Sequence, residues 1–277
     1  MSAPGQTFSK LEALGNDFVL LDQRDGRADP QPEQVRALAD RRTGIGCDQL
    51  LILQPAAAAG TDCAVSIYNC DGSPARQCGN GMRAIGLWLH QENPDRRDFL
   101  LATAAGAVAV RVADEQRIQV DMGQPDFDSD AAGFAPTSPA SELAAGVPGV
   151  LGAGTVSMGN PHLVVLLADP PTSELLEQHG RRLGSDVRFS DGVNVSFVHS
   201  AAPDRLSLRV FERGAGATRA CGSAACASAA WLLHLGRVHG PVRVDQPGGR
   251  LVIDWRGPGQ PLRMTGSARR VFDGTLR

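Results

Sequence analysis

The sequence contains very little lysine. Lys10 is the only lysine among 27 basic residues in a chain of 277. An enzyme that uses pyridoxal phosphate needs a lysine to hold the cofactor as a Schiff base, and Lys10 lies in a predicted strand close to the N-terminus. We therefore expect chemistry that does without pyridoxal phosphate.

The chain also lacks a concentrated positive charge and a long apolar run. Its formal net charge is −3 and its basic residues are dispersed, whereas binding to a phosphate backbone needs a positive face. No apolar segment approaches the roughly 18 residues of a membrane helix. The N-terminal residues do not show the basic and apolar regions of a signal peptide. We expect no nucleic-acid partner, no membrane partner and a cytoplasmic location.

The pattern of cysteines and histidines argues against both a disulfide framework and a bound metal ion. Six cysteines are too few and too scattered for a disulfide framework in a chain of this size. No Cys-x-x-Cys pair occurs, and the six histidines show no paired ligand spacing, so we expect no metal site. Cys63, Cys70 and Cys226 are expected to be buried as small apolar side chains, and the role of Cys47 is left open.

What the chain does contain is an internal repeat. The segment CGNGMRAIGLWL at residues 78–89 returns as CGSAACASAAWL at residues 221–232, displaced by 143 positions. Residues 15–18, Gly-Asn-Asp-Phe, likewise correspond to Gly-Asn-Pro-His at residues 159–162. Strand and helix patterns recur in a similar order around both pairs of segments. Such a repeat indicates two similar αβ units.

The repeat predicts an α/β (α+β) fold with two pseudo-symmetric domains, residues 1–122 and 123–266. Each contributes a polar loop and a cysteine-headed helix to a cleft between the domains, which is a natural place for a small-molecule ligand. Residues 126–154 are rich in Ala, Gly, Pro and Ser, and this composition predicts a long loop without packed elements. Gly236 is the expected C-terminal cap of the second alanine-rich helix.

The two cysteines at the heads of the repeated helices carry the predicted chemistry. Cys78 and Cys221 each precede a first helical turn, whose N–H groups have no partner inside the helix. A thiol there ionises more easily than a free cysteine, and the amides of Gly79–Asn80 and Gly222–Ser223 can hold a carboxylate. Two opposed thiols around one carboxylate suit the removal of a proton from one face of a carbon and its return on the other. This pattern predicts epimerisation or racemisation.

Several motifs make the chain similar to a known family. From Lys10 to Ala227, the segments KLEALGNDFVLLD, RRTGIGCDQ, YNCDGSPARQCGNGMR, VSMGNPH, GVNVSF and FERGAGATRACGSAACA resemble those of the diaminopimelate epimerases, which are cofactor-independent amino-acid epimerases. The resemblance implies strands wrapped around a central helix in each domain, with a tail of residues 267–277 returning to the first domain. It implies no metal or other cofactor. It also implies conversion of LL-2,6-diaminoheptanedioate to the meso form in the synthesis of lysine and peptidoglycan precursors.

The resemblance also assigns roles to residues. Cys78 and Cys221 would be the proton-transfer pair, with His162 and Glu212 assisting the thiols. The residues implied to bind substrate, together with the helix-end amides, are Asn16, Gln49, Asn69, Asn160, Asn194, Glu212 and Arg213. Phe272 stands where the family has an aromatic residue at the contact of a homodimer. Ala217 and Ala224 depart from the usual Glu and Gly of the family motifs.

Other functions remain open at this point. Residues 79–84 fit the G-x-G-x-x-A form of a dinucleotide-binding turn, which would indicate a nicotinamide-dependent oxidoreductase. However, eight residues separate this segment from the preceding strand, and the second copy lacks the glycines. A proline or hydroxyproline epimerase on the same scaffold is a nearer alternative. The many asparagines with Glu212 and Arg213 favour a substrate that is zwitterionic at both ends.

Overall fold

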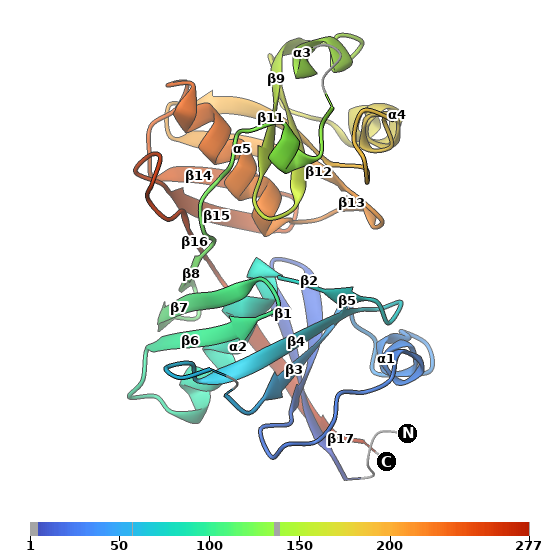
Figure 1. Ribbon diagram of the computed structural model, residues 1–277, viewed down its shortest axis with the longest axis vertical. Helices are drawn as coiled ribbons and strands as arrows, with labels where there is room; N and C mark the ends of the chain where they lie inside the picture. The colour runs from blue at the N-terminus through green and yellow to red at the C-terminus, as the bar shows by residue number, and fades with distance from the viewer. Residues whose placement is uncertain (1–4, 57, 136–138, 277) are drawn as a thin grey trace. The chain divides into compact units, whose positions relative to one another are not determined.

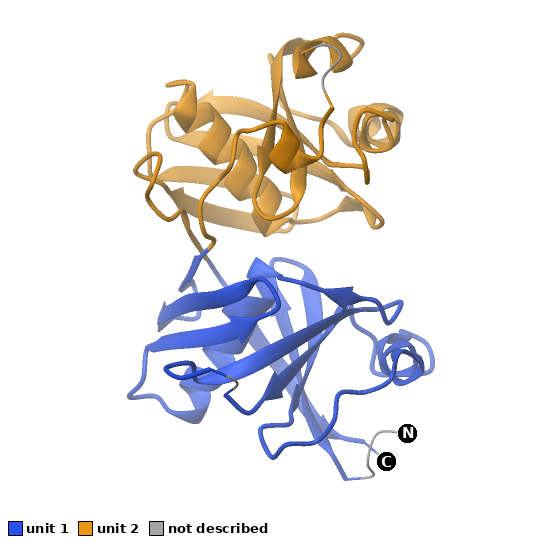
Figure 2. Cartoon of the chain, viewed as in Figure 1, with its two compact units in different colours: residues 1–121, 266–277 blue, residues 122–265 orange. Residues whose placement is uncertain are grey.

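The computed structural model describes residues 5–56, 58–135 and 139–276. The chain forms two compact units (Figure 2). Unit 1 is Met1–Asp121 with Gly266–Arg277, and unit 2 is Met122–Thr265. No helix in the described part of the chain is long and apolar enough to cross a membrane.

Unit 1 is a strongly curved sheet around one helix. Its strands are β1 (Thr7–Ala13), β2 (Asn16–Asp22), β3 (Gln49–Gln54), β4 (Cys63–Asn69), β5 (Pro74–Ala75), β6 (Asp98–Thr103), β7 (Gly106–Asp114), β8 (Arg117–Asp121) and β17 (Arg269–Thr275). They pair in the order β17-β1-β2-β3-β4-β6-β7-β8, with β5 also beside β4. The β2–β3 and β4–β6 pairs are parallel and the others are antiparallel.

Helix α2 (Gly79–Glu92) fills the inside of this curve and contacts β1, β2, β7, β8 and β17. Its residues from Gly79 to Leu89 are all buried, as expected for a helix surrounded by strands. The shorter α1 (Pro32–Ala39) packs with only two buried residues against the outer face of the sheet, beside β3. Helix α2 ends before Asn93, as the Asn-Pro sequence predicts.

The turn between β1 and β2 differs from its prediction. The sequence places the turn at residues 15–17, but the structure closes the hairpin with Leu14 and Gly15, which both have positive φ angles. Two consecutive residues in this conformation suit the right-handed twist of a two-residue hairpin. Asn16 therefore becomes the first residue of β2, which fixes its position beside the strand ends.

Unit 2 repeats the plan. Its elements are β9 (Val150–Ser157), β10 (Pro161–Leu167), α4 (Ser173–Gly184), β11 (Asn194–Ala202), β12 (Arg205–Glu212), β13 (Gly216–Thr218), α5 (Gly222–His234), β14 (Val242–Gln246), β15 (Gly249–Asp254) and β16 (Arg263–Gly266). The strands pair in the order β9-β10-β11-β12-β14-β15-β16, with β13 also beside β12. The β10–β11 and β12–β14 pairs are parallel and correspond to the parallel β2–β3 and β4–β6 pairs of unit 1, in which β17 adds one strand beside β1.

Helix α5 has the place in unit 2 that α2 has in unit 1. It contacts β9, β10, β11, β12, β14 and β15, whereas α4 lies outside the strands (Figure 1). Gly236, with a φ of 66°, follows its end, and the N–H of Arg237 donates to the carbonyl of Leu232. This is the glycine cap that the sequence predicts. The predicted α/β fold, with strands around a central helix in each unit, is confirmed.

The prediction of a structureless loop over residues 126–154 is wrong. Within the described part of this segment lie a 3-10 turn at Asp130–Ala132, a short helix α3 (Ala140–Leu143) and the first half of β9. Phe134, Leu143 and Val147 are buried in the core of unit 2 together with residues of β10 and β11. The composition is misleading because a few spaced apolar side chains are enough to anchor such a segment by tertiary packing.

Candidate active site

Cys78 caps the N-terminus of α2. Its backbone is extended, and its Sγ accepts a hydrogen bond of 3.4 Å from the N–H of Gly81. The side chain is half-buried. The thiol also donates to Oδ1 of Asn16 over 3.9 Å. The sulfur thus has a helix-end donor, which favours negative charge, on one side and an amide acceptor on the other.

Asn16 and Asn80 form a chain of side-chain amides beside Cys78. Nδ2 of Asn80 donates to Oδ1 of Asn16 over 3.4 Å, and Nδ2 of Asn16 donates to Oδ2 of Asp48 over 2.9 Å. At the other end, Arg83 donates to Oδ1 of Asn80 over 2.9 Å and to the carbonyl of Ser267 over 3.2 Å. The Arg83 side chain has no solvent exposure. The buried Asn80 side chain is therefore held by the protein itself.

Asp48 belongs to an ionic cluster. Arg41 pairs with both Asp48 and Asp17, and Lys10 donates to Asp17 and to the carbonyl of Gly46. Burial raises the pKa of Asp17, but hydrogen bonds from Arg41 and Lys10 outweigh burial and lower that pKa to about 2. The only lysine of the chain thus serves this cluster.

Gln49 and Asn69 face each other across the β3–β4 pair. Nε2 of Gln49 donates to Oδ1 of Asn69 over 2.9 Å, and Nδ2 of Asn69 donates to Oγ of Ser73 over 3.0 Å. Oε1 of Gln49 is buried and has no hydrogen-bond partner among the described residues. A buried acceptor of this kind is suited to an N–H of a ligand.

Cys221 caps α5 at the position equivalent to Cys78, but it is only 6% exposed. Its backbone N–H donates to Oε1 of Gln246 over 2.9 Å. Burial raises the pKa of the Cys221 thiol well above its ordinary value, and the negative charge of Glu212 raises it further, whereas Ser223 lowers it. The thiol form is strongly favoured in this environment.

A second chain of side chains leads to Cys221. Nδ2 of Asn160 donates to Oγ of Ser223 over 3.4 Å, and Oγ of Ser223 lies 3.5 Å from Sγ of Cys221. Nε2 of His162 lies 3.1 Å from Oδ1 of Asn160. Burial lowers the pKa of His162 to about 3, and the charge of Arg213 acts in the same direction. His162 is therefore a neutral donor, and its buried Nδ1 has no partner among the described residues.

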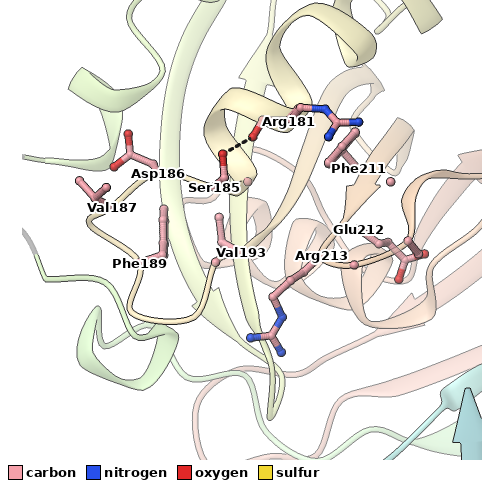
Figure 3. Close-up of a pocket in the computed structure, with 14 residues that line it drawn as sticks. Arg181, Ser185, Asp186, Val187, Phe189, Val193, Phe211, Glu212 and Arg213 are labelled. Atoms are coloured by element: carbon pink, nitrogen blue, oxygen red, sulfur yellow. Dashed lines mark hydrogen bonds between the residues drawn. The ribbon is translucent and has the colours of Figure 1, made fainter. Parts of the chain in front are cut away.

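Glu212 is the last residue of β12 and Arg213 follows it, and their side chains point apart (Figure 3). The carboxylate of Glu212 accepts from the hydroxyl of Thr218. The guanidinium of Arg213 pairs with Asp191, while its backbone N–H donates to Oδ1 of Asn194 over 3.0 Å. Asn194 also donates to the carbonyl of Pro161 over 2.9 Å. This set of contacts ties β10, β11 and β12 together next to the head of α5.

A pocket of about 600 Å³ lies beside these two residues in unit 2 (Figure 3). Its labelled lining residues are Arg181, Ser185, Asp186, Val187, Phe189, Val193, Phe211, Glu212 and Arg213. Charged side chains therefore line part of the pocket, and aromatic side chains line another part. The pocket can receive a polar ligand.

The candidate residues are divided between the two units. Unit 1 holds Asn16, Gln49, Asn69, Cys78, Gly79 and Asn80, and unit 2 holds Asn160, His162, Asn194, Glu212, Arg213, Cys221, Gly222 and Ser223. Phe272 lies apart on β17, where it is 48% exposed and contacts Phe8 edge to face. Ala217 pairs with Phe211 across β12 and β13, and Ala224 is buried.

Among the residues that contact these groups and that sequence analysis missed are Asp48, Arg83 and Gln246. Asp48 and Arg83 both lie inside the motifs RRTGIGCDQ and CGNGMR. The signal for Arg83 was the place where the repeat breaks, because Cys226 stands at the equivalent position of the second segment. Nothing in the sequence marks Gln246.

The other cysteines lie apart from these chains of contacts. Cys63 and Cys226 are fully buried, as predicted, and burial raises the pKa of Cys63 to about 11 and that of Cys47 to about 12. The prediction for Cys70 is wrong, because this residue is exposed in the turn that follows β4. Among the described residues, no group of three or more His, Cys, Asp or Glu side chains could hold a metal ion.

Known proteins resemble this chain in sequence and in fold. A family model described as diaminopimelate epimerase matches residues 8–127 and 154–271. A relative named diaminopimelate epimerase, from Alkalilimnicola ehrlichii, is 42% identical over 274 residues, which are 98% of each chain.

Solved structures share the fold at much lower identity. A phenazine biosynthesis protein of the PhzF family from Bacillus anthracis has a TM-score of 0.75 at 14% identity and covers 99% of this chain and 100% of its own. A hydroxyproline epimerase from Agrobacterium vitis has a TM-score of 0.68 at 15% identity, covering 99% and 93%. These two likenesses concern the fold alone.

Proposed function

This chain belongs to the diaminopimelate epimerase family, and on that premise we propose that it inverts one α-carbon of LL-2,6-diaminoheptanedioate to give the meso form. It is an isomerase. The observation that carries the proposal is the pair of cysteines, Cys78 and Cys221, that cap equivalent helices in two similar units. The reaction would supply the synthesis of lysine and of peptidoglycan precursors.

The proposed mechanism uses one thiolate and one thiol. The first removes the α-proton from one face of the substrate carbon, and the second donates its proton to the opposite face. The negative charge that develops next to the carboxylate is stabilised by the N–H groups at the heads of α2 and α5. After each inversion the protonation states of Cys78 and Cys221 have exchanged, so the pair serves both directions of the reaction. No cofactor takes part in this scheme.

The proposal takes the two units as domains, residues 1–122 with 267–277 and residues 123–266, each of which contributes residues that bind the substrate. The helix-end amides of Gly79, Asn80, Gly222 and Ser223 would hold the carboxylate of the reacting centre. The distal carboxylate and ammonium would meet the remaining polar residues, which are Asn16, Gln49, Asn69, Asn160, Asn194, Glu212 and Arg213. The buried Oε1 of Gln49, which has no hydrogen-bond partner in the part of the chain that the structure describes, supports an ammonium contact.

His162 and Glu212 both lie in unit 2 and would assist the proton transfer by acting on the Cys221 thiol. The neutral His162 donates to Asn160 and so acts through Ser223 on Cys221. Glu212 holds the proton on Cys221 by its negative charge. Both effects are local to the head of α5.

Incubation with LL-diaminopimelate in deuterated water tests the proposal. We expect deuterium at one α-carbon of the recovered amino acid together with the meso isomer. Proline and trans-4-hydroxyproline serve as controls, because a cyclic amino acid has only one polar end for these side chains to bind. Inversion of either control, with no exchange in diaminopimelate, would move the assignment to the proline-type epimerases.

We further propose a cytoplasmic homodimer. The exposed Val271 and Phe272 on β17 support a contact between two copies at this strand, since exposed apolar side chains on neighbouring positions favour association. Light scattering of the purified protein tests this, and a Phe272→Glu variant should then become monomeric. A monomeric wild-type protein would refute the dimer without affecting the assignment of the reaction.

A further inference from the structure

The chains of polar side chains at the two helix heads run in opposite directions. Asn80 and Ser223 occupy equivalent positions on α2 and α5, and Asn16 and Asn160 occupy equivalent positions in the repeated loops. In unit 1 the helix residue donates, because Nδ2 of Asn80 contacts Oδ1 of Asn16. In unit 2 the loop residue donates, because Nδ2 of Asn160 contacts Oγ of Ser223. Both contacts measure 3.4 Å.

In unit 1, two charged groups of opposite sign hold the ends of the chain. Arg83 has only N–H donors, so Oδ1 of Asn80 must face it and Nδ2 must face Asn16. The Asp48 carboxylate only accepts, so Nδ2 of Asn16 must face it and Oδ1 must face Cys78. Turning either amide over would place two donors or two acceptors in contact. Reversal is costly above all at Asn80 and Arg83, which are buried.

In unit 2 the groups that hold the chain are different. Position by position, Arg83 corresponds to Cys226 in the repeated helices, and the parallel strand registers place Val193 where unit 1 has Asp48. The same registers place Phe18 where unit 2 has His162. Neutral His162 donates to Oδ1 of Asn160, which turns Nδ2 toward Ser223. The hydroxyl hydrogen of Ser223 is then free to donate to Sγ of Cys221.

We propose that Arg83 and Asp48 are positioning residues. Arg83 holds Asn80, and Asp48 holds Asn16, in the orientation that turns a hydrogen-bond acceptor toward Cys78. At the equivalent place in unit 2, Cys221 receives a donor. Each of the two positioning residues acts through an amide side chain that it fixes.

The consequence is that the two amide and hydroxyl chains act on the two thiols in opposite directions. The more exposed Cys78 receives an acceptor from Asn16, which favours the thiol form, whereas the donor from Ser223 favours the thiolate of the buried Cys221 and opposes the effect of its Glu212 contact. A pair that exchanges roles in each turnover works best when neither proton is held much more tightly than the other. This consequence rests on the proposed function, but the positioning itself can be measured on the thiol.

The test is the pH dependence of alkylation of Cys78 by iodoacetamide, measured by mass spectrometry of the peptide that contains it. Only the thiolate reacts. In Asp48→Ala the Asn16 amide loses the acceptor of its Nδ2 and is then held by Nδ2 of Asn80. A fraction of the molecules can therefore turn an N–H toward Sγ, and the midpoint of the profile should fall, by at most about one pH unit. Arg41→Ala is the matched control, because it removes an ion pair of Asp48 and leaves the contact between Asp48 and Asn16 in place.

A double-mutant cycle separates positioning from simple charge. If Asp48 acts through Asn16, Asp48→Ala should cause no further shift in an Asn16→Ala background. The same shift in both backgrounds, or an unchanged profile in the single variant, would overturn the role of Asp48. Circular dichroism at each pH restricts the comparison to folded protein.

Arg83 is tested from the other end. Arg83→Met removes the donors that hold Asn80, so Asn16 loses a competing donor and accepts more strongly from Cys78. The midpoint should rise, and Asn80→Ala should abolish that rise. Arg83→Lys restores a charged donor and should return the profile toward wild type if the variant folds. If Arg83→Met still raises the midpoint in an Asn80→Ala background, Arg83 acts on Cys78 by its charge alone.

Failure of this inference and failure of the proposed function give different results. The alkylation profiles require no substrate, so they can shift as expected in a protein that does not epimerise diaminopimelate. Conversely, if the protein is an active epimerase but its Cys78 alkylation profile is unchanged in the Asp48 and Arg83 variants, the proposed function stands and the positioning role of these two residues is refuted.

Discussion

The heads of α2 and α5 have the same backbone geometry and different surroundings. Cys78 and Cys221 both cap their helices from extended conformations. Yet Cys78 is half-buried among amides, whereas Cys221 is buried beside Glu212, which raises its pKa. The repeated strand order places the two thiols equivalently within their units, and the side chains around them differ.

This difference shows which parts of a duplicated fold are free to diverge. The positions that shape the helix and its packing, such as Trp88 and Trp231, keep their residue types. The positions that set the direction of the polar chains do not, as Arg83 and Cys226 show. A reaction that removes a proton from one face of a carbon and adds a proton to the other needs two similarly built helix ends. The side chains around the two thiols need not be the same.

Removal of either sulfur should have the largest effect. Cys78→Ala and Cys221→Ala should each lower kcat for epimerisation by about 10³-fold or more, because each half of the proton transfer requires its own thiol. Circular dichroism should show a folded protein in both cases. Full activity in either variant would contradict the two-thiol scheme and with it the functional equivalence of the two helix heads.

Neutralising Glu212 should reduce the contrast between the thiols. In Glu212→Gln the pKa of Cys221 should fall, since the negative charge of Glu212 helps to raise it. Alkylation of Cys221 should begin at lower pH, and kcat should drop about 10- to 100-fold. Glu174→Gln on the exposed face of α4 is the matched control. An unchanged alkylation profile for Cys221 would remove Glu212 from its environment.

His162 should make unit 2 sensitive to mild acid. The pKa of His162 is about 3 in the folded protein, below the ordinary value of 6.5. Between these two pH values the unfolded chain therefore binds a proton at His162 and the folded chain does not. The contribution of His162 to stability is complete above about pH 6.5 and is lost by about 1.4 kcal/mol per pH unit as the pH falls toward 3.

Urea unfolding at pH 7.5 and pH 5 measures this loss. The loss on acidification should be much smaller in His162→Gln, whereas the exposed His239→Gln should behave like wild type. Asp17, whose pKa of about 2 is also depressed, should add its own loss only at lower pH, below about 4. An equal acid sensitivity in wild type and His162→Gln would show that His162 is not held neutral.

The two tryptophans should give the smallest contrast. Trp88 is 6% exposed, and its Nε1 donates to Oγ of Ser9 over 2.9 Å, so Trp88→Phe should lower the free energy of unfolding by about 1–3 kcal/mol. Trp231 is only half-buried, and Trp231→Phe should cost less than about 1 kcal/mol. Thermal unfolding of both variants tests the order, and the reverse order would show that packing also diverged between the units.

Much of the fold followed from local pattern. The repeated cysteine-headed helices, the strands at Gln49–Gln54 and Cys63–Asn69, and the glycine cap at Gly236 were all predictable. Apolar periodicity and capping depend on neighbours within a few residues, so the chain carries these signals itself. The packed segment of residues 126–154 was not predictable, because its few apolar side chains gain their meaning from distant strands.

The sequence by itself determined that two cysteines stand at two helix ends, because a cap is a local property of a few consecutive residues. Only the tertiary structure decided that Cys221 is buried beside Glu212 and that Asp48 and Arg83 direct the amides at Cys78. Burial and hydrogen-bond direction depend on groups far apart in the chain. For example, Asn16 and Asn80 are 64 positions apart and meet only once β2 and α2 are packed together.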